Sequence, residues 1–250
     1  MNETNRPYYW KECNLFRAFK ECGFEPKAIF DVGSSHSGWS WNISSLFPEA
    51  AFHLFEPLAD YKPNYQKRAA WVLASRPNLR LHKIALGEID GQTQIGSDEA
   101  GYGASTLVTE ASEIFPEMFD IPIRRLDSYV AEFGLPKPQV LKVDVQGAEL
   151  AVLEGAGSLL EDVRLIQIES WLRRSYDGKT PLLHEITEYL SGRGFSLIDF
   201  GGVYYTDLHE MLALDAFFAR VDLLDQSRGK LPNGSLIEDR DIGPLPSPIR

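Results

Sequence analysis

The stretch "IFDVGSSHSGWS", residues 29 to 40, decides how this chain can be interpreted. An apolar run meets Asp31 and Gly33, and small polar residues then lead into a helical pattern. A glycine lets a ligand approach the backbone because it has no Cβ. The start of the following helix offers free N–H groups and positive potential to an anion. The stretch therefore predicts either a surface turn or a ligand-binding loop, and its partners elsewhere in the chain must decide.

Composition limits the classes of protein to consider. The chain has 250 residues and a formal net charge of -11, which argues against binding along a nucleic-acid backbone. Only Cys13 and Cys22 occur, too few for a disulfide framework or a cysteine-based zinc cluster. No apolar run approaches the roughly 20 residues that cross a bilayer. No apolar signal-peptide region is found at the start, so we expect a cytoplasmic protein without a membrane span.

Strand and helix patterns alternate along most of the chain. Strands are expected at 27–33, 50–57, 78–87, 139–145 and 163–170. Helices are expected at 10–23, 38–47, 60–75, 126–134, 148–160 and 180–191, the last with Thr180 as N-cap and Pro181 in first position. Residues 195–200 and 213–221 favour a terminal antiparallel hairpin. Such alternation predicts an α/β fold with a mainly parallel sheet and helices on both faces.

The regular alternation is interrupted between residues 88 and 120. Asp90-Gly91 is a hairpin turn signal, and residues 97–108 favour a loop rich in small residues. The last residues are rich in Pro, Gly and charge, which is typical of a disordered tail or one docked on a partner. We therefore expect three parts, namely an N-terminal helical extension (1–26), one catalytic domain (27–223) and a C-terminal tail (224–250).

Acidic residues end four of the expected strands or their turns: Asp31, Glu56, Asp144 and Glu169. In a doubly wound sheet these positions share the carboxyl edge, where ligands bind, so they predict one polar site. Glu56 follows the glycine turn by roughly 20 residues, a position from which an acid can accept both hydroxyls of a ribose. The dinucleotide fingerprint G-x-G-x-x-G is absent, since Ser35 stands at its second glycine.

A family resemblance rests on seven segments in order: "FDVGSSHSGWS", "FHLFEP", "HKIALGEIDG", "GASTL", "RRLDSY", "LKVDVQGAELAVLEGA" and "IQIE". With these, residues 27 to 221 resemble the FkbM-type methyltransferases, a branch of the class I S-adenosylmethionine-dependent enzymes. The resemblance implies a Rossmann-like fold with a seven-stranded, mainly parallel sheet and a C-terminal antiparallel hairpin. The sequence departs from the family at Ser37, where glycine is usual, and at Gln146, where glutamate is usual.

The resemblance and the strand ends together give each candidate residue an expected role. The cofactor is expected to be S-adenosylmethionine, held by Asp31, Gly33, Ser34, Ser35, Glu56, Ala85 and Asp144. Asp144 and Glu169 are the catalytic candidates, as a general base or as ligands of Mg²⁺. Candidate acceptor-binding residues are His36, Ser105, Thr106, Trp171 and Arg173. Lys142 is expected on the opposite face of its strand from Asp144, in a structural contact.

The expected activity is O-methylation of a hydroxyl on a sugar, glycan or secondary metabolite. Two alternatives stay open: an NAD-dependent oxidoreductase, against which the missing glycine fingerprint counts, and a non-catalytic cofactor-binding module. The expected partner is a small-molecule or glycan acceptor, and self-association into a homo-oligomer also stays open.

Overall fold

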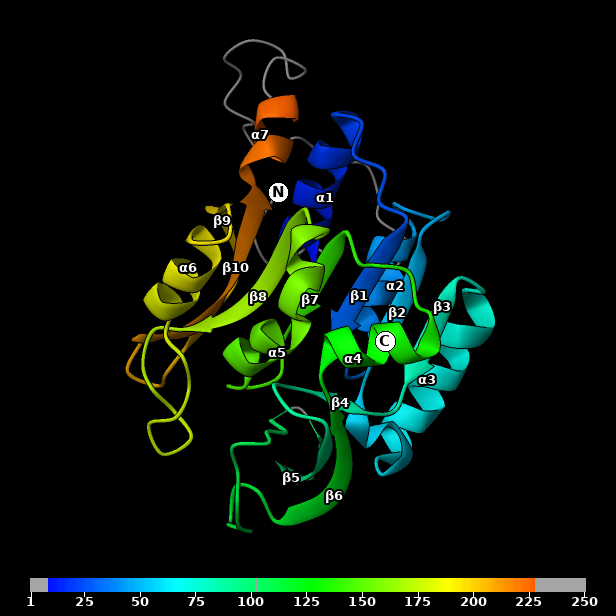
Figure 1. Cartoon of the computed structure of the whole chain (residues 1–250). Helices are drawn as coiled ribbons and strands as arrows, with labels where there is room; N and C mark the ends of the chain where they lie inside the picture. Colours follow the sequence, from blue (N-terminus) through cyan, green and yellow to red (C-terminus); the bar gives the residue numbers. More distant parts are fainter. Residues whose placement is uncertain (1–8, 102, 228–250) are drawn as a thin grey trace.

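A seven-stranded sheet forms the centre of the computed structural model, which describes residues 9–101 and 103–227 (Figure 1). In spatial order its strands are β3 (Leu79–His82), β2 (Ala51–Phe55), β1 (Ala28–Val32), β7 (Val140–Val143), β8 (Leu165–Trp171), β10 (Met211–Arg220) and β9 (Phe195–Tyr205). The first five of these run parallel, and β10 is antiparallel to both β8 and β9. The predicted sheet, with its terminal antiparallel hairpin, is confirmed.

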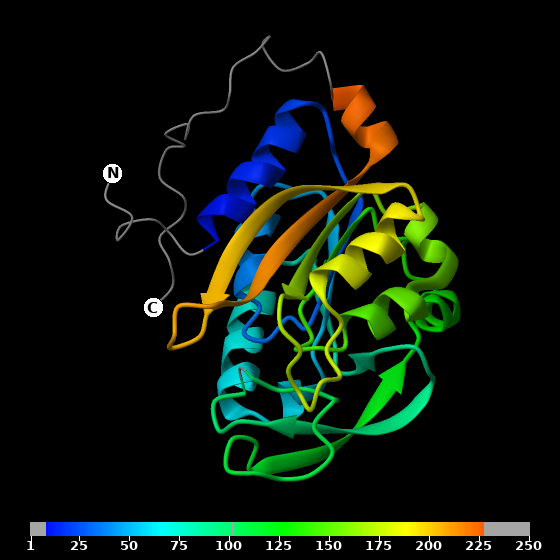
Figure 2. The ribbon, with the colours of Figure 1, turned by 90° about the vertical axis from the view of Figure 1, so that its left-hand side faces the viewer.

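Helices cover both faces of this sheet (Figure 2). One face carries α1 (Trp10–Glu21), α2 (Gly38–Ser44), α3 (Pro63–Ser75) and α7 (Val221–Ser227). The other carries α4 (Leu126–Phe133), α5 (Glu149–Ala156), the 3₁₀ helix η3 (Gly157–Glu161) and α6 (Leu183–Ser191). Strand β1 is buried along its whole length. Its consecutive residues Ile29 and Phe30 belong to the hydrophobic cores on opposite faces of the sheet. This double burial explains why β1 is a continuous apolar run up to Asp31.

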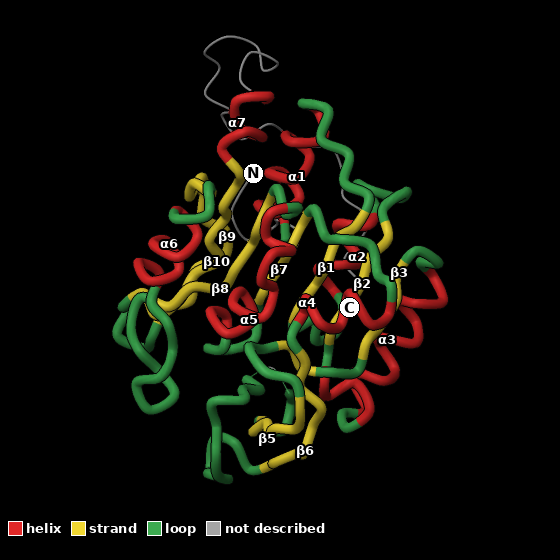
Figure 3. The backbone as a smooth tube through the Cα atoms, viewed as in Figure 1, coloured by secondary structure: helices red, strands yellow, loops and turns green. Residues whose placement is uncertain are grey.

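A second, three-stranded sheet was not predicted. It consists of β4 (Ala85–Leu86), β6 (Glu117–Arg124) and β5 (Gly91–Ser97), in that spatial order, and lies beyond the carboxyl ends of the main strands (Figure 3). The expected strand at 78–87 is therefore wrong, because its two halves, β3 and β4, belong to different sheets. The hairpin expected at Asp90-Gly91 is also wrong, because β4 and β5 flank β6 on opposite sides. Asp90 instead accepts hydrogen bonds from the Nε of Arg124 and the backbone N–H of Arg125.

Two helices begin later than predicted. Helix α3 begins at Pro63, since the residues before it form the 3₁₀ helix η2 (Pro57–Asp60). Helix α6 begins at Leu183, because the hydroxyl of Thr180 accepts a hydrogen bond from the backbone N–H of Ser175 instead of capping a helix. Most of the expected C-terminal tail, from residue 228 on, lies outside the described residues. Among those described, no helix is long and apolar enough to cross a membrane.

Candidate active site

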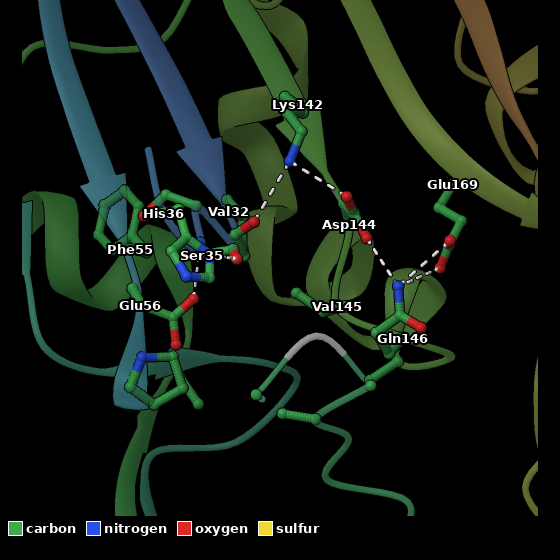
Figure 4. A pocket seen from close by; sticks show the side chains of 18 of the residues that line it. Val32, Ser35, His36, Phe55, Glu56, Lys142, Asp144, Val145, Gln146 and Glu169 are labelled. Carbon is green, nitrogen blue, oxygen red and sulfur yellow. Dashed lines mark hydrogen bonds and ion pairs between the residues drawn. The ribbon is translucent and has the colours of Figure 1, made fainter. Parts of the chain in front are cut away.

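A cavity of about 910 Å³ opens at the carboxyl ends of β1, β2 and β7 (Figure 4), and residues of the small sheet also line it. This volume lies in the upper part of the range of ligand sites in proteins. Most of the candidate residues from the sequence line it: Gly33, Ser34, Ser35, His36, Glu56, Ala85, Thr106, Asp144, Glu169 and Trp171. The fold thus brings together residues that are up to 138 positions apart, from Gly33 to Trp171.

The turn between β1 and α2 has an unusual backbone. Gly33, Ser35 and Ser37 all have positive φ, at 75°, 46° and 59°. A Cβ on Gly33 would lie 1.8 Å from the carbonyl oxygen of Asp144, so a side chain cannot be accommodated there. We expected Gly33 to make room for a ligand; the structure gives it a second reason, close packing of the ends of β1 and β7. Ser37, which stands where the family usually has glycine, adopts the left-handed conformation despite its side chain.

Glu56 ties the same turn to the end of β2. Its carboxyl oxygens accept hydrogen bonds from the backbone N–H of Ser35 at 2.8 Å and of Leu58 at 2.9 Å. Burial raises the pKa of Glu56 to about 7, although both hydrogen bonds act in the opposite direction. A carboxylate can accept about four hydrogen bonds, so two acceptor positions are left for a ligand in the cavity.

Lys142 is the charged centre between β1 and β7. Its ammonium lies 3.2 Å from Asp31 Oδ1 and 3.4 Å from Asp144 Oδ2, and it donates to the carbonyl of Gly33. Burial acts to lower the pKa of Lys142, but the carboxylates of Asp31 and Asp144 outweigh it and raise the pKa. The expectation that Lys142 and Asp144 point to opposite faces is wrong, because residues two apart in an extended chain point the same way.

Asp31 does not line the cavity. It is fully buried behind the wall, where its Oδ2 accepts a hydrogen bond from Ser40 at 2.6 Å. Its pairing with Lys142 therefore acts on the cavity only through that lysine.

Gln146 links the two catalytic candidates. Its Nε2 donates to Asp144 Oδ1 at 3.0 Å and to the two carboxyl oxygens of Glu169 at 3.0 and 3.2 Å (Figure 4). Tyr176 donates to the Oε1 of the same amide, and the hydroxyl of Ser105 donates to the backbone carbonyl of Gln146 at 2.7 Å. An uncharged amide thus stands between the carboxylates. The described residues contain no group of three or more His, Cys, Asp or Glu that could hold a metal ion.

Asp215 was not predicted from the sequence as a site residue, but it also lines the cavity. It lies on β10 directly opposite Glu169 of β8. Burial raises the pKa of Asp215 to about 7 and raises that of Glu169 well above its ordinary value, with the charge of Asp144 acting in the same direction on both. An acid within the apolar run "ALDAFFARV" is a signal that could have identified it, since a buried carboxyl without a partner is unfavourable.

Three other candidates have different surroundings. Ser105 is buried beside the cavity and does not line it. Arg173 is exposed, pairs with Glu210 at 3.2 Å and also lies outside the lining. His36 does line the cavity, where its ring packs edge-on against Tyr65 and its Nδ1 lies 3.0 Å from the Ser35 hydroxyl. Burial lowers the pKa of His36, so this ring is neutral at neutral pH.

A mainly parallel seven-stranded sheet that ends in an antiparallel hairpin, with a ligand cavity over its carboxyl edge, defines a Rossmann-like protein of the class I methyltransferase type. The sequence pattern of the methyltransferase FkbM domain matches residues 31–197. The chain belongs to the FkbM methyltransferase family, which confirms the resemblance, and methyl transfer is the class of activity that this membership assigns to it.

Individual relatives are similar to parts of this chain. The chain is 29% identical to the 2-O-methyltransferase NoeI of Sinorhizobium fredii over 167 residues, covering 62% of this chain and 67% of NoeI. It is 28% identical to the AMB antimetabolite synthetase AmbE of Pseudomonas aeruginosa, over 72% of this chain but only 10% of AmbE. The solved structure of a methyltransferase FkbM from Methylobacillus flagellatus KT superposes with a TM-score of 0.50 at 16% identity, covering 78% of this chain and 43% of that one.

Proposed function

We propose that the protein transfers a methyl group from S-adenosylmethionine to a hydroxyl of a small-molecule or glycan acceptor. The observation that carries this proposal is the presence of Glu56 and Asp144 in one cavity, at the ends of β2 and β7. The first is suited to a ribose and the second to an acceptor hydroxyl. The name of the relative NoeI, a 2-O-methyltransferase, supports oxygen as the atom that is methylated.

The residues at one side of the cavity fit the parts of this cofactor. Glu56 has acceptor capacity for the two ribose hydroxyls. The hydroxyl of Ser34 is buried in the cavity wall without a hydrogen-bond partner among the described residues, and it can bind the methionine carboxylate. Phe55, Ala85 and Ile95 supply apolar lining for the adenine. When bound, the cofactor supplies an electrophilic methyl group on a sulfonium.

Asp144 has the position and environment of a general base. Its side chain is 31% exposed, its Oδ2 is next to Lys142, and its Oδ1 accepts from Gln146. These two contacts fix the carboxylate, so that it can accept the proton of an acceptor hydroxyl as the new bond forms. Glu169, held by the same amide, orients the acceptor beside it.

Calorimetry with S-adenosylhomocysteine and with NAD tests the cofactor. We expect the homocysteine compound to bind and NAD to give no response, since the dinucleotide fingerprint is absent. Binding of NAD without binding of S-adenosylhomocysteine would instead support the oxidoreductase. A screen of hydroxyl compounds with isotope-labelled S-adenosylmethionine, read by mass spectrometry, then tests the transfer. Label on carbon or nitrogen, with none on oxygen, would contradict O-methylation.

A further inference from the structure

The side of the cavity away from Glu56 is rich in carboxyl groups, and we call it the acidic end. It is lined by Asp144, Glu169 and Asp215, and Figure 4 shows Glu56 and Glu169 on opposite sides. Glu169 and Asp215 are direct neighbours on adjacent antiparallel strands. Like charges at such a pair of positions destabilise a sheet, so this pair requires protons or a cation.

Nearby cations neutralise this pair only in part. Among the described residues that line the cavity, the only lysine or arginine side chains are Lys142 and Arg68. Lys142 forms ion pairs with Asp31 and Asp144, and Arg68 lies over the ring of Trp71, a residue of α3. Lys142 acts to lower the pKa of Asp215, but it is shared with Asp31 and Asp144, so this one ammonium does not balance the charges of all these carboxylates.

A further buried acid, Glu12 of α1, lies behind this pair. A Cβ built on Gly201 would be 3.0 Å from Glu12 Oε1 and 3.1 Å from Asp215 Cβ, so the two acids meet across β9. Burial raises the pKa of Glu12 as well. Glu12 therefore adds to the negative potential at the acidic end when it is ionised, and cannot relieve it.

An independent feature of the same wall also indicates a ligand. Trp171 lines the cavity and is 6% exposed, and its indole Nε1 has no hydrogen-bond partner among the described residues. A buried N–H without a partner is unfavourable, so a ligand oxygen is the expected partner. A second aromatic residue, Tyr204, lies near Asp215, since a Cβ on Gly202 would be 3.7 Å from its hydroxyl and 3.0 Å from Asp215 Oδ2.

We propose that the acceptor carries a protonated amino group, which binds between Glu169 and Asp215 at the acidic end. An ammonium supplies the missing charge and donates to both carboxylates through charge-assisted hydrogen bonds. The neighbouring aromatic rings favour a cation further. The indole N–H of Trp171 donates to an oxygen of the same acceptor. This inference rests on the proposed methyl transfer and adds to it the chemical class of the acceptor.

Asp215 and Tyr204 lie outside residues 31–197, the part of the chain that the family pattern matches. Tyr9 of the N-terminal segment lies outside it too and also lines the cavity. The acidic end is therefore built partly by residues outside the segment that the family pattern matches.

Binding of an amine should depend on pH. Burial raises the pKa of Asp215 to about 7 and raises that of Glu169 well above its ordinary value, so an ammonium must displace protons to bind. The charged groups that face Asp215 from the packed elements are Asp144, Glu12, Lys142 and Glu169. Affinity for the amine should rise with pH through about 7 and fall again when the amine loses its own proton.

Matched pairs of compounds test the proposal on the full chain saturated with S-adenosylhomocysteine. The probes are glucosamine, galactosamine and 2-amino-1,3-propanediol, each compared with its N-acetyl derivative by calorimetry at about pH 7.5 and pH 6. We expect at least one amine to bind about tenfold or more tightly than its N-acetyl partner, with a smaller preference at the lower pH. Absence of this preference in all three pairs, including absence of any binding, would overturn the proposal. Binding of S-adenosylhomocysteine in the same samples reports separately on the proposed cofactor.

Two variants test whether Asp215 and Glu169 cause the preference for the amine. Asp215→Asn keeps the size of the side chain and removes its charge, and should reduce the amine preference to near unity. Glu169→Gln should act in the same direction and serves if Asp215→Asn does not fold. The control Asp162→Asn removes a surface charge that pairs with Lys137, and should keep the full preference. An undiminished preference in a folded Asp215→Asn or Glu169→Gln protein would show that these carboxylates do not bind the amine.

Discussion

Buried carboxyl groups have different partners at the two ends of the cavity. Near the β1–α2 turn, Glu56 accepts hydrogen bonds from two backbone N–H groups. At the acidic end, Glu169 receives hydrogen bonds from Gln146, while Asp215 faces another acid and accepts one hydrogen bond from the backbone of Gly202. The first end is preorganised by the backbone before any ligand arrives. The second reaches charge balance only with protons or with a ligand, which suits a site where the acceptor is selected.

Replacing Asp144 should have the largest effect on activity. It tests whether the proton is removed at Asp144, between the two ends of the cavity. If Asp144 is the base, Asp144→Asn should reduce turnover by roughly 10²–10⁴ fold and leave the affinity for S-adenosylhomocysteine unchanged. Turnover is measured with the acceptor found in the screen, and affinity by calorimetry. A loss of cofactor affinity would assign Asp144 to the Glu56 end instead, and full turnover would exclude it from catalysis.

Gly33→Val should disturb the close packing between the ends of β1 and β7, which connects the two ends of the cavity. A non-glycine residue at this φ costs about 1–3 kcal/mol, and overlap with the carbonyl of Asp144 adds about 1–3 kcal/mol. The free energy of unfolding, measured in urea, should fall by both contributions. Gly178→Val is the matched control, because Gly178 has a similar φ of 78° but no atom within 4 Å of an added Cβ. Equal losses in the two variants would mean that packing against Asp144 contributes nothing.

Glu56→Ala tests whether the preorganised end holds the cofactor. Loss of a charged hydrogen-bond acceptor should weaken S-adenosylhomocysteine binding by about 1.5–3 kcal/mol. Glu185→Ala is the control, since Glu185 also accepts from a backbone N–H, that of Leu182, but does not line the cavity. Unchanged affinity in a folded Glu56→Ala protein would remove Glu56 from the ribose role.

The buried acids predict a pH dependence of stability. Burial raises the pKa values of Glu56, Glu149 and Asp215 to about 7, from ordinary values of 4.5 for glutamate and 3.8 for aspartate. Between these limits the folded state holds protons that the unfolded state has lost, so the free energy of unfolding should decrease as the pH rises from about 5 to 7. Urea unfolding across this range should show a shallower decrease for Asp215→Asn. A steeper or unchanged decrease in that variant would contradict the raised pKa of Asp215.

Arg173→Ala should have the smallest effect. The side chain is exposed and its pairing with Glu210 is a surface ion pair, which contributes about 0–1 kcal/mol. Turnover, acceptor KM and stability should all stay close to those of the unmodified protein. A marked rise in the acceptor KM would mean that the acceptor also contacts Arg173, which lies outside the cavity lining.

The predictable part of the site depends on local patterns. Asp31, Glu56, Asp144 and Glu169 each follow or end an apolar run, and strand ends of parallel neighbours meet at one edge of a sheet. Sequence alone therefore located these acids in the right region. It could not distinguish a residue that faces the cavity from one behind its wall, because both Asp31 and Asp144 pair with Lys142, and only tertiary contacts such as that of Ser40 bury Asp31.

The unpredicted parts depend on contacts between distant segments. Asp215 reaches the cavity because β10 pairs with β8 in a register that places it opposite Glu169, and a hairpin pattern alone does not set that register. Likewise, the apolar alternation continues from β3 into β4, and only the pairing of Ala85 with Ile123 moves the second half into another sheet. The prediction that Arg173 binds the acceptor rested only on its position after β8. That strand ends at Trp171, and Arg173 does not line the cavity.

The arrangement of Asp144 and Glu169 depends on one functional group, the side-chain NH₂ of Gln146. Gln146 differs from a glutamate only by an NH₂ group in place of an oxygen, yet that group is the donor to both Asp144 and Glu169. In an isosteric Gln146→Glu protein, three carboxyl groups would meet where two carboxylates now share one donor, and they would have to share protons or recruit a cation. The present residue thus links these carboxylates through one shared hydrogen-bond donor, and replacing its NH₂ group by oxygen would make their arrangement depend on proton or cation concentration.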